Sequence, residues 1–169
     1  IGDNQLILQE GTQLNADNLM SDDSTLIITP GEGMSVASVK MQNATQTIFF
    51  YGKKITVQQK SNDFRLEGDG KIQWDNNTLT GPKEIVFVSA ENTLKLYGTA
   101  KEPATIDYTG FAFKGKAEWF IIQGEKVNGN WTPNNLKSGP MKEGIIGPNP
   151  GKTKPAKAPG PKLSAPNKK

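Results

Sequence analysis

Apolar residues alternate with polar ones along much of the chain. Eight segments show this period of two: Ile48-x-Phe50, Ile55-x-Val57, Phe64-x-Leu66, Ile72-x-Trp74, Ile85-x-Phe87, Leu94-x-Leu96, Ile106-x-Tyr108 and Phe111-x-Phe113. Successive side chains of a β-strand point to opposite faces, so the pattern predicts short strands with one covered face. Apolar residues do not recur at helical spacing, so we expect fewer than about one residue in ten in α-helix.

Turn-forming residues separate these segments. They are Gly68-Asp69-Gly70, Asp75-Asn76-Asn77, Gly81-Pro82, Ala90-Glu91-Asn92, Thr109-Gly110 and Asn128-Gly129-Asn130. Such residues form the tight bends that hairpins require, whereas parallel strands would need helical crossovers. The expected fold class is therefore all-β, an open antiparallel β-jelly roll or sandwich of many short strands. The first 45 residues are less regular, with strands expected at 6–8, 26–29 and 36–39.

The composition changes near the C-terminus. From about Lys137 the chain is rich in Gly, Pro, Lys and Ala, and residues 151–169 contain no aromatic residue and only Leu163 as a large aliphatic one. Such a segment cannot offset its ordering entropy by burial. We therefore expect an all-β domain over residues 1–144, best supported over 60–125, and a disordered Lys/Pro-rich tail over residues 145–169.

The net charge of +3 is unevenly distributed. Residues 151–169 hold six of the 20 basic residues and no acidic one, so the other 14 basic and 17 acidic residues leave the body at −3. Arg65 is the single arginine. This argues against a nucleic-acid partner, because such domains concentrate basic residues on a folded face. The basic tail can contact an anionic surface or serve as a solubilising linker.

Aromatic residues could also form a platform on which nucleic-acid bases stack. The candidates are Phe49, Phe50, Tyr51 and Trp74. Base-binding platforms combine aromatic rings with basic residues, and the body is mildly acidic. We therefore assign these four rings to core packing.

The composition excludes most catalytic chemistry. With no Cys and no His, thiol nucleophiles, imidazole bases, disulfides and common zinc sites are absent. The remaining acid or base candidates are the carboxylates of Glu67, Asp69, Asp22, Asp23 and Asp63, with Asp17 as a further calcium candidate. A glycosidase built from two carboxylates stays possible, but turn carboxylates usually bond their own backbone, and calcium-loop spacing is missing. We expect a non-enzyme without cofactor or metal.

The expected location is the periplasm or another secreted or cell-envelope site. The chain opens at Ile1 rather than Met, and removal of a signal peptide is one natural cause. No apolar run approaches the length of a membrane-spanning helix.

Two segments share a sequence pattern in which alternating apolar residues are followed by glycine. Leu94-x-Leu96-x-Gly98-x-Ala100 follows one turn, and Leu66-x-Gly68-Asp69-Gly70-x-Ile72 is a second copy. Phe113-x-Gly115-x-Ala117 and the apolar run 119–122 continue the pattern. Over about residues 60–125 the chain resembles the OstA-like (LptA) family of periplasmic lipopolysaccharide-transport bridges, although Thr99 replaces that family's usual amide or acid.

The resemblance implies a V-shaped β-jelly roll that encloses an apolar trough for acyl chains. It implies a lipid or lipopolysaccharide-like amphiphile as ligand, and other β-jelly-roll subunits as partners that pair through edge strands. The residues that could line the trough are Phe64, Leu66, Ile72, Trp74, Ile85, Phe87, Leu94, Leu96, Phe111 and Phe113. The alternative is a structural or interaction β-sandwich of virion or appendage type, in which these residues form a closed core and the tail is an anchoring arm.

Overall fold

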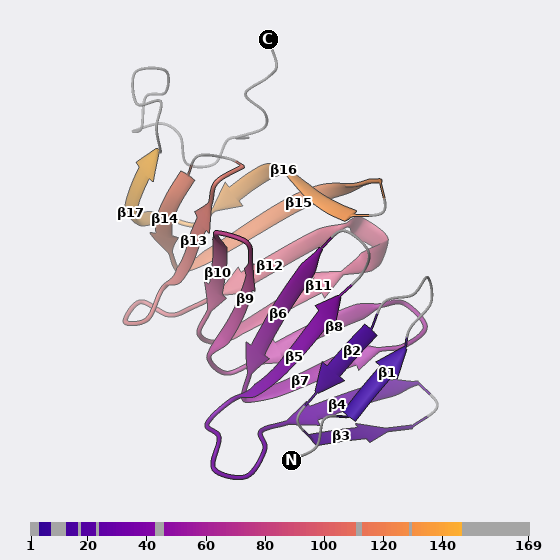
Figure 1. The fold of residues 1–169 in the computed structure, drawn as a ribbon. Coiled ribbons are helices and arrows are strands. Elements are labelled where there is room, and N and C mark those ends of the chain that lie inside the picture. The colour runs from indigo at the N-terminus through magenta and orange to yellow at the C-terminus, as the bar shows by residue number, and fades with distance from the viewer. Residues whose placement is uncertain are drawn as a thin grey trace.

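The chain folds into two antiparallel β-sheets that pack face to face (Figure 1). The computed structural model describes residues 4–7, 13–16, 18–22, 24–42, 46–110, 113–128 and 130–146. These residues form 17 strands and a three-residue 3₁₀ turn at Ser89–Glu91, with no α-helix among them. The expected fold class, an all-β sandwich of short antiparallel strands with almost no helix, is confirmed for this part of the chain.

The nine-stranded sheet, here sheet A, has β1 and β17 at its two edges. In spatial order its strands are β1 (Asn4–Ile7), β2 (Gln13–Ala16), β5 (Ala37–Gln42), β6 (Thr47–Gly52), β9 (Gly70–Trp74), β10 (Asn77–Gly81), β13 (Ala104–Tyr108), β14 (Phe113–Ala117) and β17 (Met141–Ile146).

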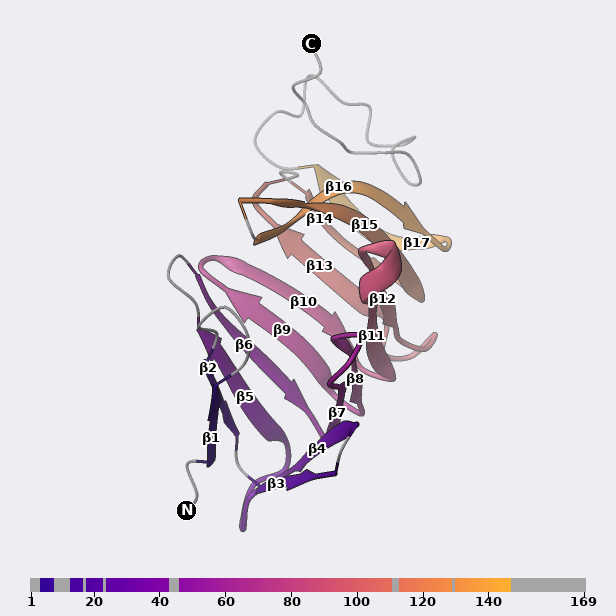
Figure 2. The same ribbon diagram turned by 90° about the vertical axis from the view of Figure 1, so that its right-hand side faces the viewer.

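The eight-stranded sheet, sheet B, has β16 and β3 at its edges. Its strands in order are β16 (Asn130–Ser138), β15 (Trp119–Val127), β12 (Thr93–Tyr97), β11 (Glu84–Val88), β8 (Asp63–Glu67), β7 (Lys54–Gln58), β4 (Thr25–Thr29) and β3 (Asn18–Ser21). Figure 2 shows β5, β6, β9 and β10 of sheet A to the left of β4, β7, β8 and β11 of sheet B.

The chain adds one hairpin to each sheet in turn. From β5 onward, hairpins β5–β6, β9–β10 and β13–β14 join sheet A, while β7–β8, β11–β12 and β15–β16 join sheet B. The strand registers place every change of sheet at one side of the sandwich and every hairpin turn at the other. We call these the crossing side and the hairpin side.

The inward residues of sheet A are all glycine or alanine on the crossing side and mostly large elsewhere. Strand register aligns them in three transverse rows. The crossing-side row is Ala37, Gly52, Gly70, Gly81, Ala104 and Ala117; the middle row is Val39, Phe50, Ile72, Leu79, Ile106 and Gly115; the hairpin-side row is Met41, Ile48, Trp74, Asn77, Tyr108 and Phe113. Small residues let the sheets approach, and large ones hold them apart, so the interior is wedge-shaped.

The crossing side is closed by direct backbone approach. A Cβ placed on Gly81 would lie 2.5 Å from the carbonyl oxygen of Glu84 and 2.7 Å from Ile85 Cγ1. A Cβ on Gly70 would lie 3.0 Å from the carbonyl oxygen of Gly81. These glycines therefore occupy positions where the two sheets leave almost no room for a side chain.

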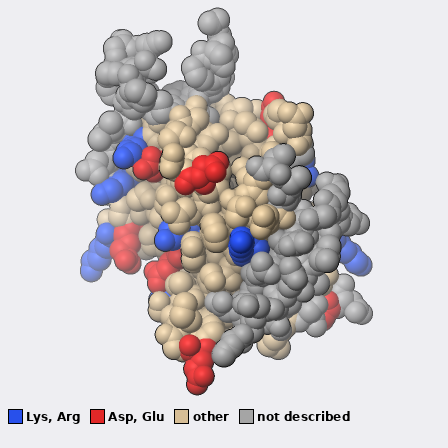
Figure 3. All heavy atoms as spheres, in the orientation of Figure 1, with Lys and Arg blue, Asp and Glu red and all other residues tan. Residues whose placement is uncertain are grey.

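The opposite faces of both sheets point outward and are more polar. The viewer sees the outer face of sheet A in Figure 3, where basic and acidic side chains are both scattered among many uncharged residues. Three surface ion pairs join Lys53 to Asp69, Arg65 to Glu84 and Lys114 to Asp107 at 3.4–3.7 Å. Such exposed pairs contribute at most about 1 kcal/mol each.

Several expectations need correction or lie outside the description. Gly68-Asp69-Gly70 and Gly81-Pro82 connect strands of different sheets, so they are crossings rather than hairpin turns. Residues 145–146, expected in the tail, belong to β17. The rest of the expected tail, residues 147–169, lies outside the described residues, so its disorder stays a prediction.

Candidate functional site

The interior between the sheets collects nearly all of the residues proposed to line a trough. Nine of them belong to one buried cluster or pack against it: Phe64, Leu66, Ile72, Trp74, Ile85, Phe87, Leu94, Leu96 and Phe113. Phe111 lies outside the described residues. The alternation in the sequence therefore placed these side chains on the correct face, and their role toward a ligand stays a prediction.

The crossing-side half of the interior is fully closed. Leu66, Ile85 and Leu96 are each 0% exposed, and cross-strand pairing places them in one row of sheet B. Ile72, in the middle row of sheet A, is 4% exposed. These four side chains form dry core, and a ligand cannot reach them without displacing other side chains.

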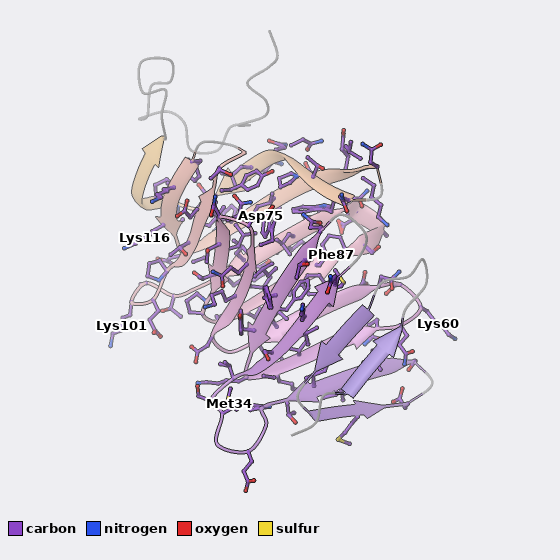
Figure 4. The ribbon with its side chains drawn as sticks, viewed as in Figure 1. Met34, Lys60, Asp75, Phe87, Lys101 and Lys116 are labelled. Atoms are coloured by element: carbon purple, nitrogen blue, oxygen red, sulfur yellow. The ribbon has the colours of Figure 1, made fainter. Side chains whose placement is uncertain are left out.

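The hairpin-side half contains both buried and partly buried side chains, and Leu94 and Phe113 there are 3% and 4% exposed. Phe64, Phe87 and Trp74 are all half-buried members of this region. The Phe64 and Phe87 rings are stacked, with centroids 5.3 Å apart. The Phe50 ring meets Phe64 edge to face, with centroids 5.1 Å apart. Figure 4 shows Phe87 in the central part of the molecule, with Lys60 of the β7–β8 turn and Lys101 of the β12–β13 crossing on opposite sides.

Trp131 extends this aromatic row and was not predicted. Its ring lies 6.0 Å from that of Phe87, and its Nε1 donates a hydrogen bond of 2.9 Å to the Asn92 carbonyl oxygen. The ring covers Gly124, where a Cβ would lie 2.5 Å from the indole. Trp131 comes from the polar strand β16, so no alternation in the sequence marked it as an interior residue.

Sheet A supplies a second aromatic group on the hairpin side. The Trp74 and Tyr108 rings lie 5.8 Å apart. Between their strands, the buried Asn77 accepts hydrogen bonds of 2.9 Å from the backbone N–H and the hydroxyl of Thr109. Burial raises the pKa of the Tyr108 phenol above its ordinary value of 10.0, which fits an apolar setting for the ring.

Other hairpin-side residues were visible in the sequence but not assigned to the site. Ile48, Val57 and Tyr108 belong to alternating pairs that predicted strands, while Met41 had no such signal. All four are partly buried and pack on the core cluster. Register between strands, which the sequence does not give, decides that they share the hairpin side.

Three of the carboxylates considered for acid or base chemistry have structural contacts. Asp22 accepts hydrogen bonds from the backbone N–H groups of Ser24 and Thr25, both at 2.8 Å, and these bonds lower its pKa from 3.8. Asp63 accepts one of 2.7 Å from the Ser89 N–H. Asp69 pairs with Lys53. Asp17 and Asp23 lie outside the described residues.

Metal ligands and unsatisfied polar groups were sought among the described residues. In that part of the chain no three His, Cys, Asp or Glu side chains lie together in a way that could hold a metal ion. Every buried side-chain nitrogen or oxygen described there has a hydrogen-bond partner. The chemistry that the interior can offer is therefore apolar contact.

The outward faces correct one expectation from the sequence. Phe50 and Trp74 belong to the core, as expected, but Phe49 and Tyr51 alternate with the inward Ile48, Phe50 and Gly52 and so point outward. Tyr51 carries the ammonium group of Lys71 4.6 Å above its ring. Phe49 is paired in register with Lys40, so each of these two rings has a basic neighbour.

Comparisons with known proteins identify no relative of this chain. The chain matches no family model, no curated protein and no solved structure. Within the described residues, no helix has the length and apolar character needed to cross a membrane.

Proposed function

We propose that this chain is a non-enzymatic cell-envelope module that holds the acyl chains of a lipid amphiphile between its two sheets. The proposal extends the resemblance to the lipopolysaccharide-transport family and places the protein in the periplasm or an equivalent envelope compartment. The acyl chains enter from the hairpin side, where the interior is widest.

The taper of the interior is the observation that supports this proposal. Fully buried side chains fill the crossing side, whereas Phe64, Phe87, Trp74 and Tyr108 on the hairpin side keep part of their surface exposed. Phe64 and Phe87 are neighbours on sheet B, and Trp74 and Tyr108 lie together on sheet A, so partly exposed rings of both sheets gather on this side. Leu94 and Phe113 on the same side are buried. A closed sandwich has no need to leave such rings partly exposed. An acyl chain laid along that side would cover them.

The energetics of such binding are adequate without polar recognition. Each buried methylene group contributes about 0.8 kcal/mol, so a chain of a dozen carbons gains several kcal/mol even after ordering costs. The rings of Phe50, Phe64 and Phe87 contact one another, and so do those of Trp74 and Tyr108, so an acyl chain would meet aromatic surface from both sheets. No cofactor is required.

Charged substitutions at two depths test the proposal. In Phe87→Asp the carboxylate starts from a partly exposed position and can stay hydrated, so we expect the β-fold to persist while binding of purified deep-rough lipopolysaccharide is lost. Leu96 is 0% exposed, so Leu96→Asp unfolds the domain by burying an unpaired charge. Thermal unfolding and lipopolysaccharide pull-down measure the two effects. A parent protein that binds no lipopolysaccharide would contradict the proposal.

Edge strands provide the route to assembly with other β-modules. Pro133 lies in β16, the C-terminal edge of sheet B, opposite Gly124 at a register shift. Proline has no N–H group to donate to a partner strand, so its presence in an edge strand disfavours pairing with another chain. β17, the edge of sheet A at the same end, contains no proline over Met141–Ile146. Of the two edge strands at this end of the sandwich, we therefore assign strand pairing to β17.

Proline scanning tests this assignment. Neighbouring residues of an antiparallel edge strand direct their N–H groups alternately outward and inward. One of the variants Glu143→Pro and Gly144→Pro therefore blocks an incoming strand while keeping the pairing with β14. Sedimentation velocity at rising concentration should show association of the parent protein and its loss in one variant. Association that survives both substitutions would exclude β17.

The structural alternative keeps one observation in its favour. The core contains many side chains below 5% exposure, as expected for a sandwich whose purpose is rigidity. In that case Phe87→Asp destabilises the protein about as strongly as Leu96→Asp, and no lipid copurifies or crosslinks.

A further inference from the structure

A part of the outer face of sheet A has an unusual composition. The outward residues of β5, β6, β9 and β10 are Ser38, Lys40, Gln42, Thr47, Phe49, Tyr51, Lys71, Gln73, Thr78 and Thr80. We call this set the amide-hydroxyl face. It holds two lysines, two aromatic rings, amides and hydroxyls, and none of its ten members is a carboxylate.

Acidic residues border this face but do not enter it. Asp107 follows Thr78 in register on β13 and pairs with Lys114 at 3.4 Å. Asp75 lies in the β9–β10 turn, where Figure 4 labels it. By contrast, the outer face of sheet B mixes Arg65 and Lys95 with Glu67 and Glu84. The body as a whole is acidic, so the absence of carboxylates is a local property of these four strands.

Register also fixes how the cations and rings are arranged. Phe49 lies between Lys40 and Gln73, and Tyr51 lies between Ser38 and Lys71. The Lys71 ammonium is held 4.6 Å above the Tyr51 ring, which orients the cation before any ligand arrives. Strand geometry separates the Cα atoms of the two lysines by about 12 Å.

We propose that the amide-hydroxyl face binds an acidic glycan chain. Sugar hydroxyls exchange hydrogen bonds with Gln73, Thr78 and Thr80. The apolar face of a sugar ring packs on Phe49, and the two lysines pair with widely spaced carboxylates along the chain. This site is independent of acyl binding in the interior.

Charge density favours a glycan over a single-stranded nucleic acid. A nucleic acid carries a phosphate on every unit, and its binding grooves track that backbone with closely spaced Lys and Arg residues. The amide-hydroxyl face has two lysines over four strands and no arginine. A polymer with a carboxylate on every second sugar fits that spacing better.

Binding of the full chain to immobilised hyaluronan tests the proposal, with dextran as the neutral polymer and oligothymidylate as the nucleic acid. We expect Phe49→Ala and Lys71→Gln each to weaken hyaluronan binding about tenfold. Both side chains point outward, so thermal unfolding should change little. Matched controls are Val86→Ala and Lys95→Gln, cross-strand neighbours on the outer face of sheet B, which should alter binding less than about twofold.

The outcomes separate this face from general attraction of a polyanion to the protein. The six lysines of residues 151–169 are present in every variant, and Phe49→Ala removes no charge. Loss with the sheet A variants alone, together with no binding to dextran, supports the glycan site. Equal loss in the sheet B variants, no preference for hyaluronan over dextran, or tighter binding of oligothymidylate through the same face would overturn it.

Discussion

At the scale of single residues, side-chain size determines the distance between the sheets. Glycine and alanine form the crossing-side row of sheet A, opposite the fully buried Ile55, Leu66 and Ile85 of sheet B. The wedge-shaped interior follows from this arrangement. Volume added on the crossing side must push the sheets apart, whereas the hairpin side has exposed surface into which side chains can move.

Gly81→Ala tests this size rule. The new methyl group would meet Glu84 carbonyl oxygen and Ile85 at 2.5 and 2.7 Å, so we expect a loss of about 1–3 kcal/mol in the free energy of unfolding. Thr78→Ala, on the outward side of the same strand, should change it by less than about 0.5 kcal/mol. Urea denaturation measures both. A neutral Gly81→Ala would show that the crossing side is not tightly closed.

Asp22 gives the chain a local sensitivity to acid. Its carboxylate accepts hydrogen bonds from the N–H groups of Ser24 and Thr25, and these lower its pKa below 3.8. The stabilisation is present above the ordinary Asp pKa and is lost as the pH falls through the lowered value. Carbon-detected NMR titration should place the Asp22 midpoint below 3.8. Asp22→Asn keeps an acceptor oxygen and should retain the turn, while Asp22→Ala should not.

At the scale of elements, the half-buried Trp131 and the buried Leu136 attach the edge strand β16 to the core. Trp131 packs on Phe87 and Gly124 and donates to the Asn92 carbonyl oxygen. We expect Trp131→Ala to cost roughly 3 kcal/mol, and Trp131→Phe, which keeps a ring but loses the hydrogen bond, about 1 kcal/mol. Urea denaturation measures the loss in the free energy of unfolding for each variant. Amide hydrogen exchange should increase more in β16 than in the other strands, and most in the alanine variant. An equal increase in all strands would contradict this anchoring role.

The strands that the sequence predicts and those it misses differ for a physical reason. Strands such as β8 and β11 carry two large apolar inward residues, so their alternation is visible. In β10 the inward residues are Asn77, Leu79 and Gly81, because Asn77 bonds Thr109 and Gly81 makes room for Ile85. The wedge itself therefore hides the alternation in β10. In β16 the polar sequence reflects an edge position with one neighbouring strand.

In the candidate site, alternation determines which face a residue lies on, and strand register determines which side of the sandwich it lies on. Alternation assigned Phe64, Phe87 and Leu96 to the interior, since period two decides the face. It could not separate the closed crossing side, where Leu96 lies, from the hairpin side, where the partly buried Phe64 and Phe87 lie. That division depends on pairing among strands far apart in the sequence.

At the scale of the whole molecule, alternating hairpins produce a sandwich with distinct sides and ends. The crossing side is closed, the hairpin side carries the half-buried aromatic residues, and edge strands lie at both ends of each sheet (Figure 1). A ligand held along the hairpin side would run from one end of the sandwich toward the other. Modules joined through β17 would continue the same apolar surface.

Photocrosslinking from the interior tests the central claim most directly. Benzoylphenylalanine is placed at Phe87, which faces the interior, and in a matched variant at Val86, which faces outward on the same strand. Both proteins are irradiated with deep-rough lipopolysaccharide below its aggregation threshold. We expect a lipid adduct from position 87 and little from position 86. Equal crosslinking from the two positions, or none from position 87 in a folded protein, would contradict an acyl-binding interior.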